Sequence, residues 1–337
     1  MENKNLTIIV PVYHPTNTLE DIFYNILKQK DHNFDVILLI DRPSDNDFET
    51  IEKLRNKLGK NLKLVINTSH QHIDIVLKQA SELVETEYSY VLYSYSKLKS
   101  EFVSRINSFL NSVNEKPDFV ELPGILKGFI HNKFNFEKFS GIQNKVLEIE
   151  KNKEIVSKIA PFSFNFIIKN EVLKLALEHQ KSKDINLQMS PSLSFKSILL
   201  SKTFAFLDTT WVEDYNYDLM VLNIKSLQRN WDEIFKLAKE LNKQDYFEVL
   251  EFSKFINFAY YFAGYLGTCR YCKRSKTQER ALHNLTILLD DVIKKQNEEL
   301  NEEWNKNPYF SKPNVLEIKD LALSFTQWDL LFKKKLW

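Results

Sequence analysis

The feature that most constrains the fold is a repeated alternation of short apolar runs and amphipathic segments over the first ~115 residues. Four runs rich in β-branched and aromatic residues predict buried strands, at residues 6–12, 34–40, 62–66 and 88–93. Apolar residues at helical spacing follow each of them, over residues 19–27, 48–58, 73–84 and 102–113. Strands that alternate with helices pair in parallel, because each helix carries the chain back across the sheet. The pattern therefore predicts an α/β fold with a mostly parallel sheet and flanking helices.

The pattern changes further along the chain. Strand-like runs and helical segments are mixed, with strands predicted at 118–122, 164–168 and 204–207 and helices at 145–158 and 171–179. From about residue 220 the apolar spacing becomes helical, with faces over 282–293 and 318–332. We predict a sheet domain at 1–218 followed by a helical C-terminal region at 219–337.

Composition excludes several classes of protein. The chain has 46 Lys and Arg against 45 Asp and Glu, so it lacks the basic excess with which nucleic-acid binders neutralise phosphates. Two Cys exclude a disulfide-rich secreted scaffold and agree with a reducing compartment. No uncharged apolar run reaches the roughly 18 residues of a transmembrane helix, and the first residues lack the apolar core of a signal peptide. We therefore expect a cytoplasmic protein with no nucleic-acid partner.

The predicted sheet also locates the expected ligand site. In an open sheet of parallel strands, ligands bind outside the carboxyl ends of the strands. The loops that follow Val12, Ile40 and Tyr93 lie at that edge. We therefore expect the functional residues in these loops.

Two of these loops carry motifs that resemble a known family. Pro11-Val12-Tyr13-His14 closes the first strand, and Ile40-Asp41-Arg42-Pro43-Ser44 closes the second. Weaker similarity continues at 85–92 and 164–173, so the resemblance spans about residues 6–215. On these residues the chain resembles the family 2 inverting glycosyltransferases of the GT-A fold. The resemblance implies a GT-A-like sheet that binds a nucleotide-sugar and transfers the sugar to a glycan or lipid acceptor.

The chain departs from the family at its metal site. In the family an Asp-x-Asp motif after the fourth strand holds a divalent cation beside the leaving diphosphate, and hard oxygen ligands suit Mg²⁺ or Mn²⁺. Tyr93-Ser94-Tyr95-Ser96 stands at that place and has no acid. The resemblance therefore implies Mg²⁺ or Mn²⁺ only if other acids of the chain form a site. The second Asp of the family's Asp-Asp-Gly-Ser element is also replaced, by Arg42.

The family's catalytic base has no clear counterpart either. In the family a carboxylate deprotonates the acceptor hydroxyl, and linear spacing places it near residues 187–190, which contain no acid. The Glu-Asp pair of this region is Glu213-Asp214. Asp214 is the candidate base, and the alternative is that the pair lies in an exposed turn.

Six residues are candidates for substrate binding, namely Pro11, Tyr13, Asp41, Arg42, Ser94 and Ser96. Tyr13 packs on a nucleobase, or it is a partly buried residue of a turn. Asp41 contacts the nucleotide, or it caps a helix. Arg42 pairs with a phosphate and so replaces metal charge, or it is a solvated loop residue. The hydroxyls of residues 93–96 line a metal-free pocket, or they mark a site that has lost catalysis.

Three other motifs have a functional and a structural interpretation. Cys269 and Cys272 form a lone Cys-x-x-Cys without the further ligands of a zinc site, which favours a structural role. His70-Gln71-His72 opens a predicted helix, which favours capping or exposure over metal binding. The aromatic stretch 255–266, followed by a basic cluster, is either a core helix or a surface for the inner face of a membrane.

Two functions therefore stay open. The first is a nucleotide-sugar-dependent glycosyltransferase, either cytoplasmic or peripheral at the membrane. The second is a catalytically inactive relative that serves as a binding or scaffold subunit, with a protein partner or a membrane surface at its C-terminal helices. The acids missing at residues 93–96 motivate the second function.

Overall fold

The structure is a computed structural model. It describes residues 4–13, 19–128, 132–134, 136–179, 190–208, 212–216, 222–270, 274–300, 304 and 306–336. At 126–128, 132–134, 136–137 and 213–216 it describes the backbone alone. Three positions that the sequence singles out lie outside the described residues: His14, the expected position of the catalytic base at 187–189, and Cys272.

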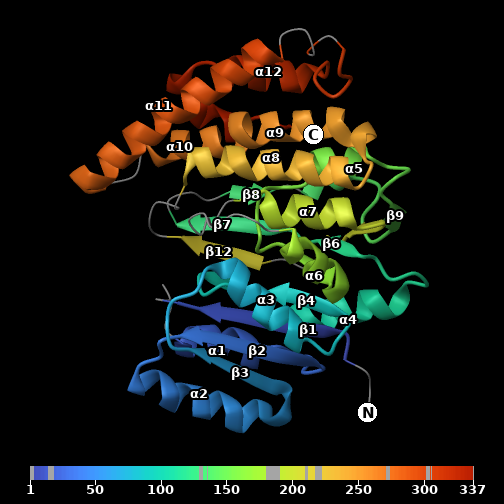
Figure 1. The fold of residues 1–337 in the computed structure, drawn as a ribbon, viewed down its shortest axis with the longest axis vertical. Coiled ribbons are helices and arrows are strands. Elements are labelled where there is room, and N and C mark those ends of the chain that lie inside the picture. The colour runs from blue at the N-terminus through green and yellow to red at the C-terminus, as the bar shows by residue number, and fades with distance from the viewer. Residues whose placement is uncertain are drawn as a thin grey trace.

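A sheet of eight strands forms the centre of the molecule (Figure 1). In sheet order the strands are β3 (Leu62–Asn67), β2 (Phe34–Asp41), β1 (Leu6–Val12), β4 (Tyr88–Val91), β10 (Phe166–Lys169), β6 (Phe119–Glu121), β11 (Thr203–Phe206) and β9 (Val146–Glu148). All run in one direction except β10 and β9, which pair antiparallel with their neighbours. From β1 the chain proceeds to β2 and β3 on one side, and β4 returns to the other side of β1. Strand order thus reverses at β1, and such switch points open a crevice at the carboxyl ends of the strands.

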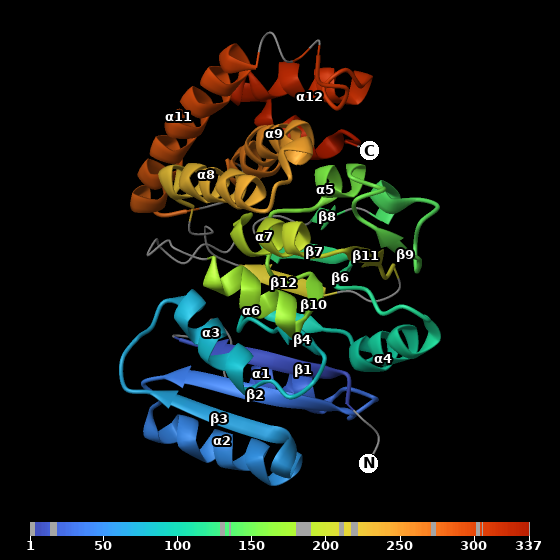
Figure 2. The ribbon, with the colours of Figure 1, turned by 45° about the vertical axis from the view of Figure 1, so that its right-hand side comes forward.

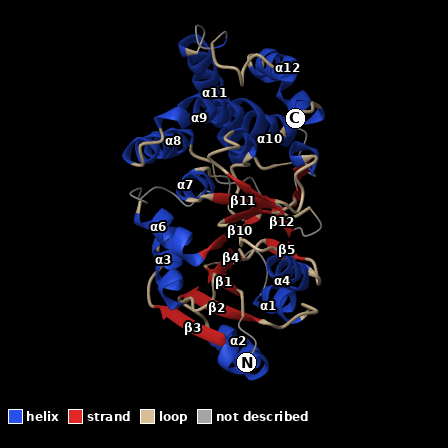
Figure 3. Ribbon diagram, turned by 90° about the vertical axis from the view of Figure 1, so that its right-hand side faces the viewer, coloured by secondary structure: helices blue, strands red, loops and turns tan. Residues whose placement is uncertain are grey.

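Helices cover both faces of this sheet (Figure 3). One face carries α3 (Ile73–Leu83), α6 (Asn170–Glu178) and α7 (Ser192–Leu200), and the other carries α1 (Leu19–Leu27) and α4 (Phe102–Ser112). Helix α2 (Asp45–Leu58) packs beside α1 and leads through the short 3₁₀ turn η1 (Gly59–Asn61) into β3. Every residue of β1 is buried, which explains its continuous apolar run, since a strand covered on both faces does not alternate.

A second, smaller sheet was not predicted from the sequence. It contains β5 (Ser96–Leu98), β12 (Val212–Asn216), β7 (Gly124–Gly128) and β8 (Asn132–Phe134), in that order. Its strands are short and rich in polar residues and Gly, so they lack the apolar signal of a strand. The prediction that Glu213 and Asp214 lie in an exposed turn is wrong, because both belong to β12, between β5 and β7.

The predicted helix at 145–158 is also wrong. Its first part is the edge strand β9, and only its last part is helical, as α5 (Glu154–Lys158). Asn144 has a positive φ of 58°, and its N–H donates to the Phe206 carbonyl at 2.7 Å, so the chain turns onto the sheet edge there. The apolar residues at 146 and 147 then face a strand neighbour, whereas their spacing alone suits a helix equally well.

The C-terminal part of the chain is helical (Figure 2). Its elements are α8 (Ile224–Glu240), η3 (Gln244–Tyr246), α9 (Phe247–Ile256), the π-helical turn η4 (Asn257–Phe262), α10 (Ala263–Cys269), α11 (Lys276–Glu299), α12 (Pro313–Ala322) and the 3₁₀ segment η6 (Phe325–Lys333). The face predicted over 318–332 is therefore divided between α12 and η6. Trp231 of α8 packs on Phe195 of α7, with ring centroids 4.7 Å apart, which joins these helices to the sheet layer. The division at 218/219 falls between β12 and α8 and stays a prediction.

The aromatic stretch 255–266 is a core segment. Phe255, Phe258 and Phe262 are each at most 1% exposed, so their rings face the protein interior. Cys269, at the end of α10, is fully buried. None of the helices in the described part of the chain combines the length and the apolarity that crossing a membrane requires.

The close approach of α10 to η6 gives a stability prediction. A Cβ at Gly267 would lie 2.4 Å from backbone atoms of Trp328 and Asp329, whereas one at Gly264 would meet only the side chain of Phe332. Backbone cannot move aside as a ring can, so we expect Gly267→Ala to lower the free energy of unfolding by about 3 kcal/mol. Gly264→Ala should cost about 1 kcal/mol or less, because Ala favours the helix. Urea unfolding of both variants measures the difference, and equal losses would contradict this packing.

Candidate functional site

The candidate site lies where the carboxyl ends of β1, β2 and β3 meet. Tyr13 follows the last residue of β1, Asp41 is the last residue of β2, and Asn67 is the last residue of β3. Asp41 and Asn67 are partners in the parallel register. The sheet therefore places an aromatic ring, a carboxylate and an amide at one edge, as the topology predicted for the first two.

Asp41 is the buried centre of this edge. The residue is only 8% exposed, and both of its carboxylate oxygens accept hydrogen bonds. Oδ1 accepts from Asn67 Nδ2 at 2.9 Å, and Oδ2 accepts from the Gln71 backbone N–H at 2.9 Å and from His70 Nδ1 at 3.1 Å. A buried carboxylate needs such donors, because losing its hydration is costly. Asp41 thus fastens the loop between β3 and α3 to the tip of β2.

The helix-capping interpretation of Asp41 is wrong. Helix α2 is capped by Ser44, whose hydroxyl accepts from the Asp47 N–H while the Asp47 carboxylate accepts from the Ser44 N–H. That reciprocal arrangement is a complete capping box. The Asp41 carboxylate therefore serves the neighbouring loop rather than the following helix.

Tyr13 and His70 form an aromatic stack beside this carboxylate. Their ring centroids are 3.5 Å apart, with an angle of 18° between the planes. Tyr13 is 43% exposed, and His70 lies against one face of its ring. An aromatic face next to a hydrogen-bond acceptor suits a planar heterocycle that carries an N–H group. Pro11, by contrast, lies within β1 opposite Leu39 and is buried in the sheet.

Arg42 has an unusual backbone conformation. Its φ of 51° lies in the left-handed region, which costs free energy for a residue other than Gly. Its backbone N–H donates to Asn67 O at 2.9 Å, and its Nε donates to Thr68 O at 3.2 Å. These bonds hold the strained turn and keep the exposed guanidinium beside the loop that follows β3.

The segment Tyr93–Ser96, for which the resemblance implies the family's metal position, carries hydroxyl groups and no acid. Tyr93 and Tyr95 stack with ring centroids 5.3 Å apart. Ser96 is 1% exposed, and among the described residues its Oγ has no hydrogen-bond partner. Neutral hydroxyls do not match the charged oxygen ligands that Mg²⁺ and Mn²⁺ favour. The described residues contain no group of three His, Cys, Asp or Glu side chains that could hold a metal ion.

Asp214 lies next to this segment in the smaller sheet. Strand β12 pairs antiparallel with β5, and Asp214 is the register partner of Ser96. The structure thus brings the candidate base position to the Tyr93–Ser96 segment, although 118 residues separate Asp214 from Ser96 in the sequence. Ser94 lies in the turn between β4 and β5.

A second acid ends a strand at the same edge of the large sheet. Glu121 closes β6, and its Oε1 accepts from Lys138 Nζ, with both side chains 3% exposed. Burial raises the pKa of Glu121, opposed by the positive charge of Lys138. The ion pair holds η2 (Phe136–Phe139) against the sheet, and burial keeps the Glu121 carboxylate out of contact with a substrate in solvent.

Sequence reasoning missed three residues of the site, namely Asn67, His70 and Gln71. The motif His70-Gln71-His72 was interpreted as capping or exposed, and His72 does cap α3 by accepting from the Asp74 N–H at 3.3 Å. His70 instead turns back to Asp41. The available signal was positional, because polar residues that follow a third parallel strand reach the same edge as those that follow the first two.

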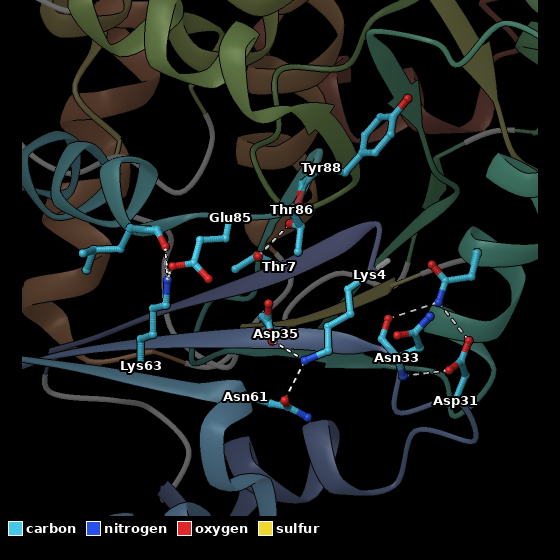
Figure 4. Close-up of polar contacts among 12 residues, drawn as sticks. Lys4, Thr7, Asp31, Asn33, Asp35, Asn61, Lys63, Glu85, Thr86 and Tyr88 are labelled. Atoms are coloured by element: carbon cyan, nitrogen blue, oxygen red, sulfur yellow. Dashed lines mark hydrogen bonds and ion pairs between the residues drawn. The ribbon is translucent and has the colours of Figure 1, made fainter. Parts of the chain in front are cut away.

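The opposite edge of the sheet carries a separate open depression of about 640 Å³. Ion pairs join most of its charged side chains, including Lys4 with Asp35 at 2.5 Å and Lys63 with Glu85 at 2.6 Å (Figure 4). Lys4 also donates to Asn61 at 2.6 Å, which ties the start of β1 to that of β3. These groups already satisfy one another, which indicates a structural role at the amino ends of the strands.

The fold matches solved structures of TarS from S. aureus. The fragment 1–349 in complex with UDP-GlcNAc matches with a TM-score of 0.62 at 14% identity, over 97% of this chain and 91% of that one. The same fragment in complex with UDP matches with a TM-score of 0.60 at 15% identity, over 89% and 92% of the two chains. A longer TarS structure is matched over 95% of this chain but only 55% of its own length, at 13% identity and a TM-score of 0.60.

These matches establish the fold and leave function to the site. The chain has the GT-A-like fold that its sequence predicted, with a mostly parallel sheet and a helical C-terminal region. No protein-family model and no curated protein sequence matches the chain. At identities this low, the likeness carries no residue-by-residue assignment.

The burial of Asp41 gives a stability prediction. Asp41→Ala removes the acceptor of the Gln71 N–H and of the Asn67 amide, so we expect the free energy of unfolding to fall by about 2–3 kcal/mol. Amide exchange at Gln71 should accelerate at the same time. Asp45→Ala, at an exposed position of α2, is the matched control and should change stability by less than about 0.5 kcal/mol. Equal stability of the two variants would contradict the anchoring role of Asp41.

Proposed function

We propose that this chain binds a nucleotide-sugar at the carboxyl ends of β1, β2 and β3 and transfers the sugar to a glycan or lipid acceptor. The observation that carries the proposal is the buried Asp41 carboxylate beside the partly exposed ring of Tyr13, where the His70 ring stacks on Tyr13 and bonds to Asp41. Support comes from the fold, since a TarS fragment with the same architecture was solved in complex with UDP-GlcNAc.

In this proposal, two complementary contacts recognise the nucleobase of the donor. Its ring stacks on Tyr13, and such stacking on an aromatic side chain contributes about 1–3 kcal/mol. Its edge donates to Asp41, which can only accept hydrogen bonds when ionised. Uracil and guanine both carry a ring N–H, so a uridine or guanosine diphosphate sugar suits this pair of contacts. Arg42, beside Asp41, supplies positive charge for the diphosphate.

Transfer requires one proton movement and one displacement at the anomeric carbon. The Asp214 carboxylate takes the proton of the acceptor hydroxyl, and the hydroxyl oxygen attacks the anomeric carbon from the face opposite the diphosphate. The bond from this carbon to the phosphate oxygen breaks as the new glycosidic bond forms, and the nucleoside diphosphate leaves with the electron pair. A divalent cation at this step stays a prediction. The described residues contain no group of three His, Cys, Asp or Glu side chains that could hold one.

A second candidate function is an inactive relative that binds but does not transfer. The observation that favours it is the hydroxyl-only segment Tyr93–Ser96 at the place of the family's metal ligands. Such a protein would keep the contacts of Tyr13 and Asp41 and serve as a binding or scaffold subunit. A protein partner or a membrane surface at the C-terminal helices stays a prediction, and so does a cytoplasmic location.

The binding claim is tested by calorimetric titration with UDP, GDP and their sugars, each with and without Mn²⁺. We expect micromolar to millimolar binding of one nucleotide, which Tyr13→Ala weakens about tenfold, equal to about 1.4 kcal/mol. Tyr24→Ala is the matched control, because Tyr24 is 65% exposed on α1 and is not part of the site. Failure of every nucleotide to bind both the wild-type protein and its His70→Ala variant would refute both candidate functions. An equal loss for both variants would exclude Tyr13 as the stacking residue.

The transfer claim is tested by Asp214→Asn. We expect release of the nucleoside diphosphate in the presence of a glycan acceptor panel to fall at least about 100-fold, while nucleotide affinity is unchanged. Glu213→Gln, one residue away on β12, is the control and should retain activity. Full activity of Asp214→Asn would show that another residue is the catalytic base. A wild-type protein that binds nucleotide and transfers no sugar would establish the inactive relative.

A further inference from the structure

The contacts proposed for the nucleobase are occupied by a side chain of the protein itself. His70 presents a flat nitrogen heterocycle to the face of Tyr13 at 3.5 Å, and its Nδ1 lies 3.1 Å from Asp41 Oδ2. Because the carboxylate can only accept, the nitrogen that faces it carries the proton. An imidazole thus offers the same two features, an aromatic face and a ring N–H, that a base would offer.

His70 and a nucleobase cannot stack on the same face of Tyr13 and bond to Asp41 at the same time. The His70 imidazole makes both of these contacts. A nucleobase that contacts both Tyr13 and Asp41 therefore needs the volume that the imidazole fills. The other hydrogen bonds of Asp41 stay in place during such an exchange, since Oδ1 accepts from Asn67 and Oδ2 also accepts from the Gln71 N–H. We infer that His70 occupies the nucleobase position of the ligand-free protein and competes with the donor for it, an inference that rests on the proposed function.

The surrounding loop allows this exchange without unfolding. The His70 side chain is 39% exposed, whereas that of Asp41 is 3% exposed, so the imidazole can rotate into solvent. The loop is held by bonds that do not involve His70, namely the Gln71 N–H to Asp41 and Gln71 Nε2 to Ser69 Oγ at 2.7 Å. When the imidazole leaves, the incoming base restores the hydrogen bond that Oδ2 loses. Nucleotide affinity is therefore the difference between two sets of similar contacts.

The consequence is that removing His70 strengthens nucleotide binding. In a calorimetric titration with UDP and GDP, we expect His70→Ala to bind about tenfold more tightly than wild type, since a ring stack and a charged hydrogen bond no longer compete. His70→Phe keeps the stack and loses the hydrogen bond, while His70→Asn keeps a donor and loses the stack. Both should fall between wild type and His70→Ala.

Two controls separate competition from a general change in the loop. His72→Asn alters the neighbouring histidine but keeps a good helix cap for α3, so its affinity should equal that of wild type. Free imidazole should weaken nucleotide binding to His70→Ala toward the wild-type value, because it refills the vacated position. A purely structural role of His70 gives no such response to imidazole.

The outcomes distinguish this inference from the proposed function. If wild type binds nucleotide and His70→Ala binds equally or more weakly, His70 is a ligand contact or a bystander, and the inference falls while the function stands. If only the His70 variants bind, both the site and the competition are established. If neither wild type nor any His70 variant binds a nucleotide, the function and the inference fall together.

Discussion

The hydrogen bonds that converge on Asp41 organise the edge of the sheet on which the functional account depends. One carboxylate at the end of β2 accepts from the amide of Asn67 at the end of β3 and from the Gln71 backbone and the His70 ring in the loop beyond. The same histidine lies against Tyr13, which follows β1. Three strand tips are thereby joined through one buried charge. The arrangement is stable because donors replace the lost hydration of the carboxylate, and it suits binding because an exposed aromatic ring lies beside it.

Much of the sheet could be predicted because its central strands, such as β1 and β2, are buried on both faces. The runs that became β1 and β2 are continuous and apolar, and the helices between them keep a regular apolar spacing. The edge strand β9 and the strands of the smaller sheet gave no such signal. Their residues, such as Gly124 and Ser96, are small or polar, and only pairing partners that are distant in the sequence make them strands. Those pairings are non-local and leave no trace in local periodicity.

Part of the candidate site could also be predicted, namely the residues that directly follow strongly predicted strands. Tyr13 and Asp41 follow strongly predicted strands, so the topology of a parallel sheet brings them together. His70 was interpreted by its local position before a helix, which correctly described its neighbour His72. That His70 turns back to Asp41 follows from a contact across 29 residues, which no local pattern encodes. The placement of Asp214 opposite Ser96 depends likewise on a strand pairing between distant segments.

The charges of the chain nearly balance, yet one segment of the candidate site contains no acidic residue. Residues 93–96 contain no acid, although the chain has 45 acidic residues in total. In the proposed function, binding of the nucleobase does not need those acids, because Tyr13 and Asp41 supply its contacts, whereas the charge of the leaving diphosphate must be balanced by other groups. In that proposal, nucleotide recognition and sugar transfer are therefore treated as separable properties, and the first is its central claim.

A crystal structure of the wild-type protein with bound UDP or GDP tests that claim most directly. The account predicts a base stacked on Tyr13, a ring nitrogen of the base within hydrogen-bond distance of Asp41, and the His70 ring rotated away from both. A nucleotide bound away from the ends of β1 and β2, with the ring of His70 still lying on Tyr13, would contradict it.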